Sequence, residues 1–133
     1  MDYKVLLLDD ERILLQGLAN KIALMDLPLR IIGEAGDGEE GLAYMELEMP
    51  DIVITDIRMP EMDGLAFIAR VRSLRKPIQC VIISGYDDLE YARQASHLGV
   101  RHYLHKPVDH AELQSVLTDI VLQLRRGDSS HAR

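Results

Sequence analysis

The sequence has little of what a secreted, membrane-bound or nucleic-acid-wrapping protein needs. Its one cysteine, Cys80, cannot form a disulfide within the chain, so we expect a reducing, cytoplasmic environment. No apolar run approaches the ~20 residues that span a bilayer, and the first residues lack the features of a secretory signal. The formal net charge of −7 argues against direct wrapping of nucleic acid. We therefore expect no membrane partner and no direct DNA contact.

Five short, continuously apolar runs are spaced along the 133 residues, and each is predicted to be a buried strand. They are 4–8, 29–33, 51–55, 79–83 and 102–105. A strand that is apolar on both faces is typical of a parallel sheet covered by helices on each side. The length and the hydrophobic fraction of 47% suffice for one domain with its own core.

Apolar residues at helical spacing follow each run, so strand and helix alternate five times. The helices are marked by Ile13, Leu14, Leu18, Ile22 and Met25; by Leu42 and Met45; by Leu65, Ile68, Val71 and Leu74; by Leu89, Ala92, Ala95 and Leu98; and by Leu113, Val116, Leu117, Ile120, Val121 and Leu124. Asp63 is the expected N-cap of the third helix, and Gly99 the expected end of the fourth.

This alternation favours a doubly wound α/β fold, because right-handed crossovers leave few other topologies and a closed barrel would need eight units. We expect one domain over residues 1–124. Residues 125–133 are polar and are expected to be a frayed C-terminal tail or the start of a linker.

Polar side chains follow four of the five predicted strands. Asp9 and Asp10 follow the first strand, Asp56 the third, Ser84 the fourth and Lys106 the fifth. In open α/β sheets, ligand sites form outside the carboxyl ends of the strands. We therefore expect these five side chains to converge on one edge of the sheet.

The chemistry of this group suits phosphoryl transfer. Three neighbouring carboxylates repel one another, and Mg²⁺ would relieve the repulsion while leaving coordination positions for water and phosphate. Asp56 can act as a carboxylate nucleophile, Lys106 can offset phosphate charge, and the Ser84 hydroxyl can donate to a phosphoryl oxygen. Singly, each residue also suits a turn, a helix cap or a solvated surface position; their joint placement favours the site.

With these residues in view, the sequence resembles the receiver domains of bacterial response regulators from about residue 4 to residue 124. The motifs that carry the resemblance are Asp9-Asp10-Glu11, Asp56-Ile-Arg-Met-Pro-Glu-Met-Asp-Gly64, Ser84-Gly-Tyr86 and Lys106-Pro107. The resemblance implies an α/β, flavodoxin-like (βα)₅ fold, with a five-stranded parallel sheet in the order 2-1-3-4-5.

By the same resemblance, Asp56 would accept a phosphoryl group from a histidine kinase. Asp10 and Asp56 would bind Mg²⁺ directly. Asp9 would act mainly through water, and the main-chain carbonyl of Arg58 would complete the protein ligands.

The resemblance also assigns a switch. Ser84 would move to the phosphoryl oxygen, Tyr103 would turn inward behind it, and Lys106 would contact the phosphate. The Lys106–Pro107 peptide bond would be cis, in keeping with the restriction of cis bonds to X-Pro. Phosphorylation would then reshape the face formed by the fourth helix, fifth strand and fifth helix, where homodimerisation or output contacts are expected.

Arg58 and Tyr86 stand at the two positions that modulate phosphoryl lifetime in such domains. Both side chains are large, so we hypothesise that they hinder the attacking water.

Residues 84–93 and 99–107 most closely resemble receivers that precede AraC-type DNA-binding domains. We therefore expect these residues to belong to a longer transcription regulator that contacts DNA through an output domain outside this chain. A stand-alone receiver is the alternative.

Two other functions are weighed against this switch. A phosphatase of the haloacid-dehalogenase type would carry a second Asp two residues after the nucleophile, where this chain has Arg58. A receiver-like module that is never phosphorylated would commonly lack a member of the acidic set. We therefore expect a phosphoacceptor with slow, Mg²⁺-dependent autodephosphorylation, and not an enzyme.

Overall fold

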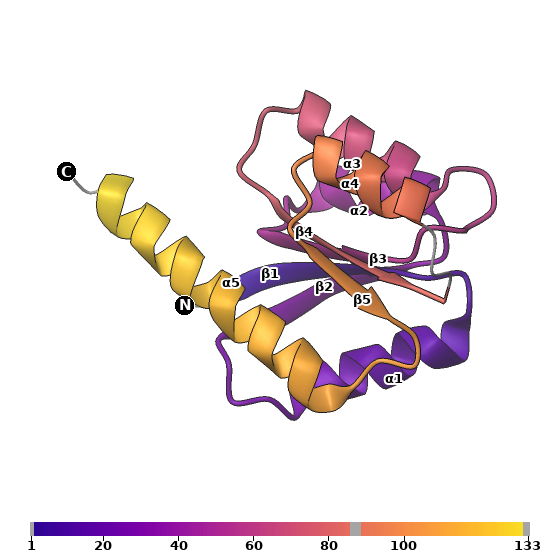
Figure 1. Ribbon diagram of the computed structural model, residues 1–133. Helices are drawn as coiled ribbons and strands as arrows, with labels where there is room; N and C mark the ends of the chain where they lie inside the picture. Colours follow the sequence, from indigo (N-terminus) through magenta and orange to yellow (C-terminus); the bar gives the residue numbers. More distant parts are fainter. Residues whose placement is uncertain (1, 86–88, 132–133) are drawn as a thin grey trace.

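Five parallel strands form one sheet in the order β2-β1-β3-β4-β5 in the computed structural model, which describes residues 2–85 and 89–131 (Figure 1). The strands are β1 (Tyr3–Leu8), β2 (Leu29–Ala35), β3 (Ile52–Thr55), β4 (Gln79–Ser84) and β5 (His102–His105). The helices are α1 (Arg12–Ala23), α2 (Gly38–Leu47), α3 (Gly64–Ser73), α4 (Leu89–His97) and α5 (His110–His131). The predicted alternation and strand order are confirmed.

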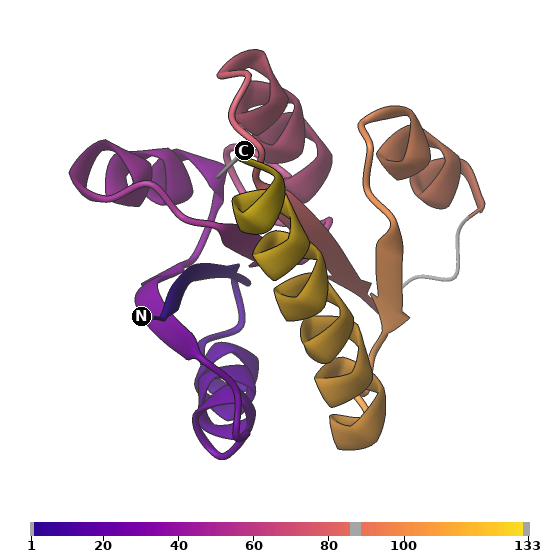
Figure 2. The same cartoon turned by 90° about the vertical axis from the view of Figure 1, so that its left-hand side faces the viewer.

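Helices cover both faces of the sheet, which explains the continuously apolar strands. α1 and α5 pack on one face, whereas α2, α3 and α4 pack on the other (Figures 1 and 2). Along β1, Val5 and Leu7 join the core beneath α1 and α5, while Leu6 and Leu8 join the opposite core. Successive side chains of a strand point to opposite faces, so a strand between two helical layers must be apolar throughout.

Local signals at the helix ends behave as the sequence predicts. The Asp63 carboxylate accepts a hydrogen bond of 2.8 Å from the main-chain N–H of Ala66, which confirms the N-cap of α3. Gly99 has φ +81°, a left-handed conformation that glycine adopts without the steric clash of a Cβ atom, and it follows α4.

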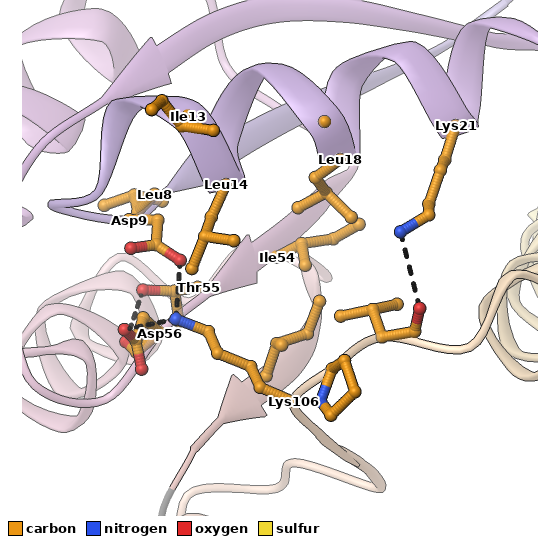
Figure 3. A pocket seen from close by; sticks show the side chains of 14 residues that line it. Leu8, Asp9, Ile13, Leu14, Leu18, Lys21, Ile54, Thr55, Asp56 and Lys106 are labelled. Carbon is orange, nitrogen blue, oxygen red and sulfur yellow. Dashed lines mark hydrogen bonds and ion pairs between the residues drawn. The ribbon is translucent and has the colours of Figure 1, made fainter.

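The apolar stripe of α1 is only partly buried. Leu15 and Ile22 are buried, but Ile13 is 83% exposed and Leu14 is 43% exposed. The first turns of α1 lie beside the carboxyl edge of the sheet, where the strands beneath the helix end (Figure 3). Helical spacing in a sequence identifies the apolar side of a helix, but it does not show where the strands beneath that helix end.

α5 runs to His131 and therefore passes residue 124, where the sequence predicts a frayed tail or a linker. Its C-terminal end projects away from the sheet (Figure 1). Propagating an existing helix adds one hydrogen bond for each residue that is fixed, so a helix can continue into a polar stretch of sequence. Among the described residues, no helix is both long and apolar enough to cross a bilayer.

Two glycine substitutions should shift stability in opposite directions. Gly99→Ala would place a Cβ atom on left-handed backbone and should lower the free energy of unfolding by about 1 kcal/mol. Gly17→Ala lies inside α1, where an added Cβ meets nothing within 4 Å, and should raise it by about 1 kcal/mol through helix propensity. Urea unfolding of both variants measures the difference, and equal shifts would contradict this account of Gly99.

Candidate functional site

Three aspartates gather at the carboxyl edge of the sheet, after β1 and β3. Ligand oxygens of Asp9, Asp10 and Asp56 all lie within 4.8 Å of one another. Asp9 and Asp56 are buried, each 7% exposed, while Asp10 is exposed. Two members of the cluster are therefore shielded from solvent, whereas the third leaves one side of it accessible.

Lys106, which follows β5, reaches into this cluster. Its Nζ donates to Asp9 Oδ2 at 2.8 Å and to Asp56 Oδ2 at 3.0 Å (Figure 3). The lysine side chain is largely buried, with 18% of its surface exposed. One ammonium group thus links two carboxylates that come from different strand ends.

Main-chain hydrogen bonds fix both buried carboxylates. Asp56 Oδ1 accepts from the N–H of Ile57 at 2.7 Å, and Asp9 Oδ1 accepts from the N–H of Glu11 at 2.9 Å. The N–H of Asp56 itself donates to the carbonyl of Leu8 at 2.9 Å, which continues the pairing of β1 and β3 past Thr55. The Oδ2 atom of each carboxylate is thereby left facing Lys106.

Gly64 allows α3 to begin directly against the site. A Cβ atom at this position would lie 1.9 Å from the carbonyl oxygen of Asp56, well inside van der Waals contact. The Gly64 N–H donates to the carbonyl of Ile57 at 2.7 Å. The loop between β3 and α3 is therefore folded tightly back on Asp56, and only glycine permits the approach.

The ionisation of the site reflects the burial of its charged groups and the contacts between them. Burial raises the pKa of Asp56, and the hydrogen bond and charge of Lys106 offset this only in part. Burial alone would lower the pKa of Lys106, but its hydrogen bonds to Asp9 and Asp56 outweigh burial and raise it. An ion pair ordinarily lowers the pKa of its acid. Here desolvation dominates at Asp56, and the nearby Asp9 carboxylate adds to it.

The donor set fits Mg²⁺. Hard divalent ions prefer carboxylate oxygens, and Mg²⁺ retains several waters on its open side. Two buried aspartates and the exposed Asp10 supply such a half-shell. Their charge exceeds what one ammonium can balance, so a divalent cation would relieve repulsion that Lys106 leaves in place.

The remaining predicted residues lie around this centre. Ser84 is fully buried at the end of β4, and its carbonyl accepts from the N–H of Lys106 at 2.9 Å. Tyr103 is half-buried on β5, with its ring 5.4 Å from that of His105. The Lys106–Pro107 peptide bond is cis, as the resemblance implies. Tyr86 lies outside the described residues.

The Arg58 side chain contacts Tyr91 of α4. The arginine side chain is exposed, and its guanidinium carbon lies 5.3 Å from the centre of the Tyr91 ring. This separation is within the range of a cation–π interaction. Sequence reasoning did not find this contact, because no local pattern relates a loop residue after β3 to a helix after β4.

A second feature missed from the sequence is an apolar groove of about 600 Å³ that opens beside Asp56. We call it the α1 groove; its walls are Ile13, Leu14 and Leu18 of α1 together with Pro107 and Val108 (Figure 3). The Lys21 Nζ donates to the Val108 carbonyl at 3.4 Å at the end of the groove far from Asp56. The exposed apolar residues of α1 therefore border the acidic cluster.

Comparison with known proteins relates this fold and site to one family. Residues 5–118 match the family described as response regulator receiver domain. YesN, an uncharacterised transcriptional regulatory protein of Bacillus subtilis, is 42% identical over 126 residues, covering 95% of this chain and 34% of YesN. HptR, a transcriptional regulatory protein of Staphylococcus aureus, is 38% identical over 131 residues, covering 98% of this chain and 51% of HptR.

Among solved structures, the receiver domain of AraT, a response regulator of Geobacillus stearothermophilus, superposes with a TM-score of 0.89. It is 34% identical, and the match covers 96% of this chain and 99% of that one. The chain spans between about a third and a half of the length of the curated relatives named above.

Removing the buried charge should stabilise the fold. Because the pKa of Asp56 is raised above its unfolded value of 3.8, folding costs free energy at every pH where the carboxyl must ionise. Asp56→Asn should therefore raise the free energy of unfolding by about 1 kcal/mol at pH 7. The gain should shrink as the pH falls towards 4, because the folded carboxyl, which has the higher pKa, takes up a proton first and then no longer carries a buried charge. Thermal unfolding at several pH values measures it.

Asp26→Asn is the matched control for this measurement. Asp26 is exposed, so the substitution removes one negative charge without changing a buried site. A gain of equal size in both variants would attribute the effect to net charge and would contradict the burial argument.

Proposed function

This chain belongs to the family of response regulator receiver domains, and we propose that Asp56 is the phosphoacceptor of its switch. Response regulators are partners of histidine kinases and carry output domains such as DNA-binding domains. The single observation that supports the assignment best is the link from Lys106 to both Asp9 and Asp56 across two strand ends. This geometry supports a functional site that includes Asp56, because an isolated aspartate at a strand end would have no such partners.

The transfer step would use Asp56 as a nucleophile. A carboxylate oxygen attacks the phosphorus of a phosphohistidine, the P–N bond breaks as the P–O bond forms, and the imidazole leaves with the bonding electron pair. The Ile57 N–H and Lys106 hold the carboxylate in one orientation before the donor arrives. This preorganisation removes the need to order the nucleophile during the reaction.

Mg²⁺ bound at the acidic cluster would neutralise charge that develops on the transferring phosphoryl oxygens. We propose that Asp10 and Asp56 hold it directly, that Asp9 acts mainly through water, and that the main-chain carbonyl of Arg58 completes the set. The Lys106 ammonium would pass from Asp56 to the new phosphoryl group, which carries more negative charge than the carboxylate did.

The signal would leave through Ser84 and Tyr103. The Ser84 hydroxyl is buried behind the site, so a phosphoryl oxygen on Asp56 gives it a strong acceptor. Movement of Ser84 would leave space into which the half-buried Tyr103 turns, changing the face of α4, β5 and α5. We propose that this face mediates homodimerisation or contact with an output domain, that the output is transcription, and that the protein acts in the cytoplasm.

The domain boundary belongs to the same proposal. The receiver would comprise residues 1–124, and the helical residues after 124 would lead into the output domain of a longer regulator. The relatives YesN and HptR, which are both longer than the matched region, support this view. DNA would be contacted only through that further domain.

Phosphorylation of Asp56 can be tested directly. Incubation with acetyl phosphate and Mg²⁺ should add the mass of one phosphoryl group to the intact chain, and Asp56→Ala should abolish the addition. Asp26→Ala, which changes an exposed aspartate, is the control and should be labelled like the wild type. Labelling that persists in Asp56→Ala would refute the assignment, and repeated turnover of small phosphate esters would indicate a phosphatase instead.

The lifetime of the phosphoryl group gives another prediction. Slow, Mg²⁺-dependent autodephosphorylation would end the signal, and the large side chains of Arg58 and Tyr86 would hinder the attacking water. Arg58→Ala and Tyr86→Ala should then each speed acyl-phosphate decay several-fold, as followed by intact mass after removal of the donor. Unchanged decay in both variants would show that neither residue shields the acyl phosphate.

We further propose that the α1 groove is covered by the kinase helix that carries the phosphohistidine. Asp9, Asp56 and Lys106 also line the groove. A protein-bound phosphohistidine that reaches Asp56 would therefore bring the helix that carries it over the α1 groove. Ile13 is 83% exposed, which leaves apolar surface available for that contact.

Ile13→Ser separates this docking from the chemistry. The substitution should slow phosphotransfer from a histidine kinase about tenfold or more, because an exposed apolar contact is lost, while labelling by acetyl phosphate should stay unchanged. Leu47→Ser, at an exposed apolar residue of α2, is the control and should affect neither rate. Equal loss with both donors would assign Ile13 a structural role.

A further inference from the structure

Main-chain hydrogen bonds hold the loop between β3 and α3 on both sides of Arg58. Before it, the carbonyl of Ile57 accepts from the Gly64 N–H at 2.7 Å. After it, the Met62 N–H donates to the Pro60 carbonyl at 2.7 Å, and the carbonyl of Met62 accepts from the Gly38 N–H at 3.0 Å. The Arg58 side chain adds a contact of a different kind, because it reaches from this loop to another helix.

Packing against the core holds the Tyr91 ring in place for that contact. Its ring is half-buried and packs against the core beneath α2, α3 and α4, while one face lies under the Arg58 guanidinium. A cation held over an aromatic ring in this way is worth about 0.5–1 kcal/mol at an exposed site, which corresponds to roughly a two- to fivefold change in an equilibrium constant. The contact joins the metal-side loop to α4.

α4 is anchored at its opposite end. Arg72 of α3 donates from Nε to the Leu98 carbonyl at 2.7 Å and from a terminal nitrogen to the Ile78 carbonyl at 2.6 Å. The C-terminal end of α4 is thereby tied to α3 and to the start of β4. Tyr91 lies in the other half of the helix, so the Arg58 contact is a second fixed point between α4 and the body of the domain.

We propose that the Arg58–Tyr91 contact couples α4 to the metal site, so that Mg²⁺ binding and the ordering of α4 favour each other. Tyr91 is a positioning residue in this scheme: it restrains the Arg58 side chain and, through it, the main chain of the loop. The inference rests on the proposed function, in which the Arg58 carbonyl is a Mg²⁺ ligand. Coupling between two sites is reciprocal, so α4 must gain from Mg²⁺ what Mg²⁺ gains from α4.

The consequence is a connection that bypasses Ser84 and Tyr103. A partner that fixes α4 from outside would tighten Mg²⁺ binding and prepare Asp56 for phosphorylation. Conversely, Mg²⁺ would alter α4 before any phosphoryl group arrives.

Mg²⁺ affinity of the unphosphorylated chain tests the coupling. Titration calorimetry should show binding about two- to fivefold weaker in Tyr91→Leu, which removes the ring, and in Arg58→Gln, which removes the cation but keeps the carbonyl. Tyr91→Phe keeps the ring and should restore wild-type affinity. The double variant Arg58→Gln/Tyr91→Leu should be no weaker than either single variant, because both remove the same contact.

Hydrogen exchange of the α4 amides tests the reverse direction. Mg²⁺ should slow exchange in the N-terminal half of α4 in the wild type and in Tyr91→Phe, by a factor similar to the loss of affinity, and should not do so in Tyr91→Leu. Arg93→Gln breaks an exposed ion pair with Glu90 on the same helix and controls for general weakening of α4. It should leave Mg²⁺ affinity unchanged.

The outcomes separate the two proposals. A wild-type chain that binds no Mg²⁺ would overturn the metal site and this inference with it. A wild type that binds Mg²⁺, with equal affinity in Tyr91→Leu, would overturn the coupling alone. Loss of affinity in Arg93→Gln as large as in Tyr91→Leu would assign the effect to helix stability and would also overturn it.

Discussion

The structure depends on one ammonium group placed between two buried carboxylates. Lys106 lies 97 residues from Asp9 and 50 from Asp56 along the chain, and only the parallel sheet brings the three together. Without the lysine, two desolvated carboxylates would face each other, and at least one would take up a proton. With it, both carboxylates have a cationic partner, although burial still raises the pKa of Asp56. Three carboxylates and one ammonium group leave an excess of negative charge that would make a divalent cation a favourable addition.

The fold supports this arrangement through its rigidity. Strands buried on both faces leave the ends of β1 and β3 little freedom to move apart, and the main-chain bond from Asp56 to Leu8 fixes their separation. Gly64 then brings the start of α3 against the carbonyl of Asp56. Moving these strand ends apart would reduce the repulsion between the carboxylates, but it would break the main-chain hydrogen bond and disperse the cluster. Holding like charges close together in this way is the usual conflict between stability and a charged site.

The sequence was informative where the chemistry follows from topology. Apolar runs predicted the strands, and the rule that carboxyl ends of parallel strands share an edge predicted that Asp9, Asp56 and Lys106 would converge. It was uninformative where an outcome depends on how far a neighbour extends. Ile13 belongs to an apolar stripe yet is exposed beside the carboxyl edge of the sheet. The Arg58–Tyr91 contact depends on the placement of α4 over the sheet, which no local pattern records.

The features proposed for phosphoryl delivery and for output lie on opposite faces of the sheet, next to the edge that carries Asp56. On one face, α1 and the connection after β5 form an apolar groove that borders Asp56, suited to a partner that delivers the phosphoryl group. On the other, Arg58 leads from the loop after β3 to α4, which belongs to the face proposed for output. Because α1 and α4 lie on opposite faces of the sheet, the proposed delivery and response would use separate surfaces. A kinase that covers the α1 groove, as proposed, would leave α4 accessible to a second partner, so that one small domain could receive a signal and pass it on without exchanging partners at a single site.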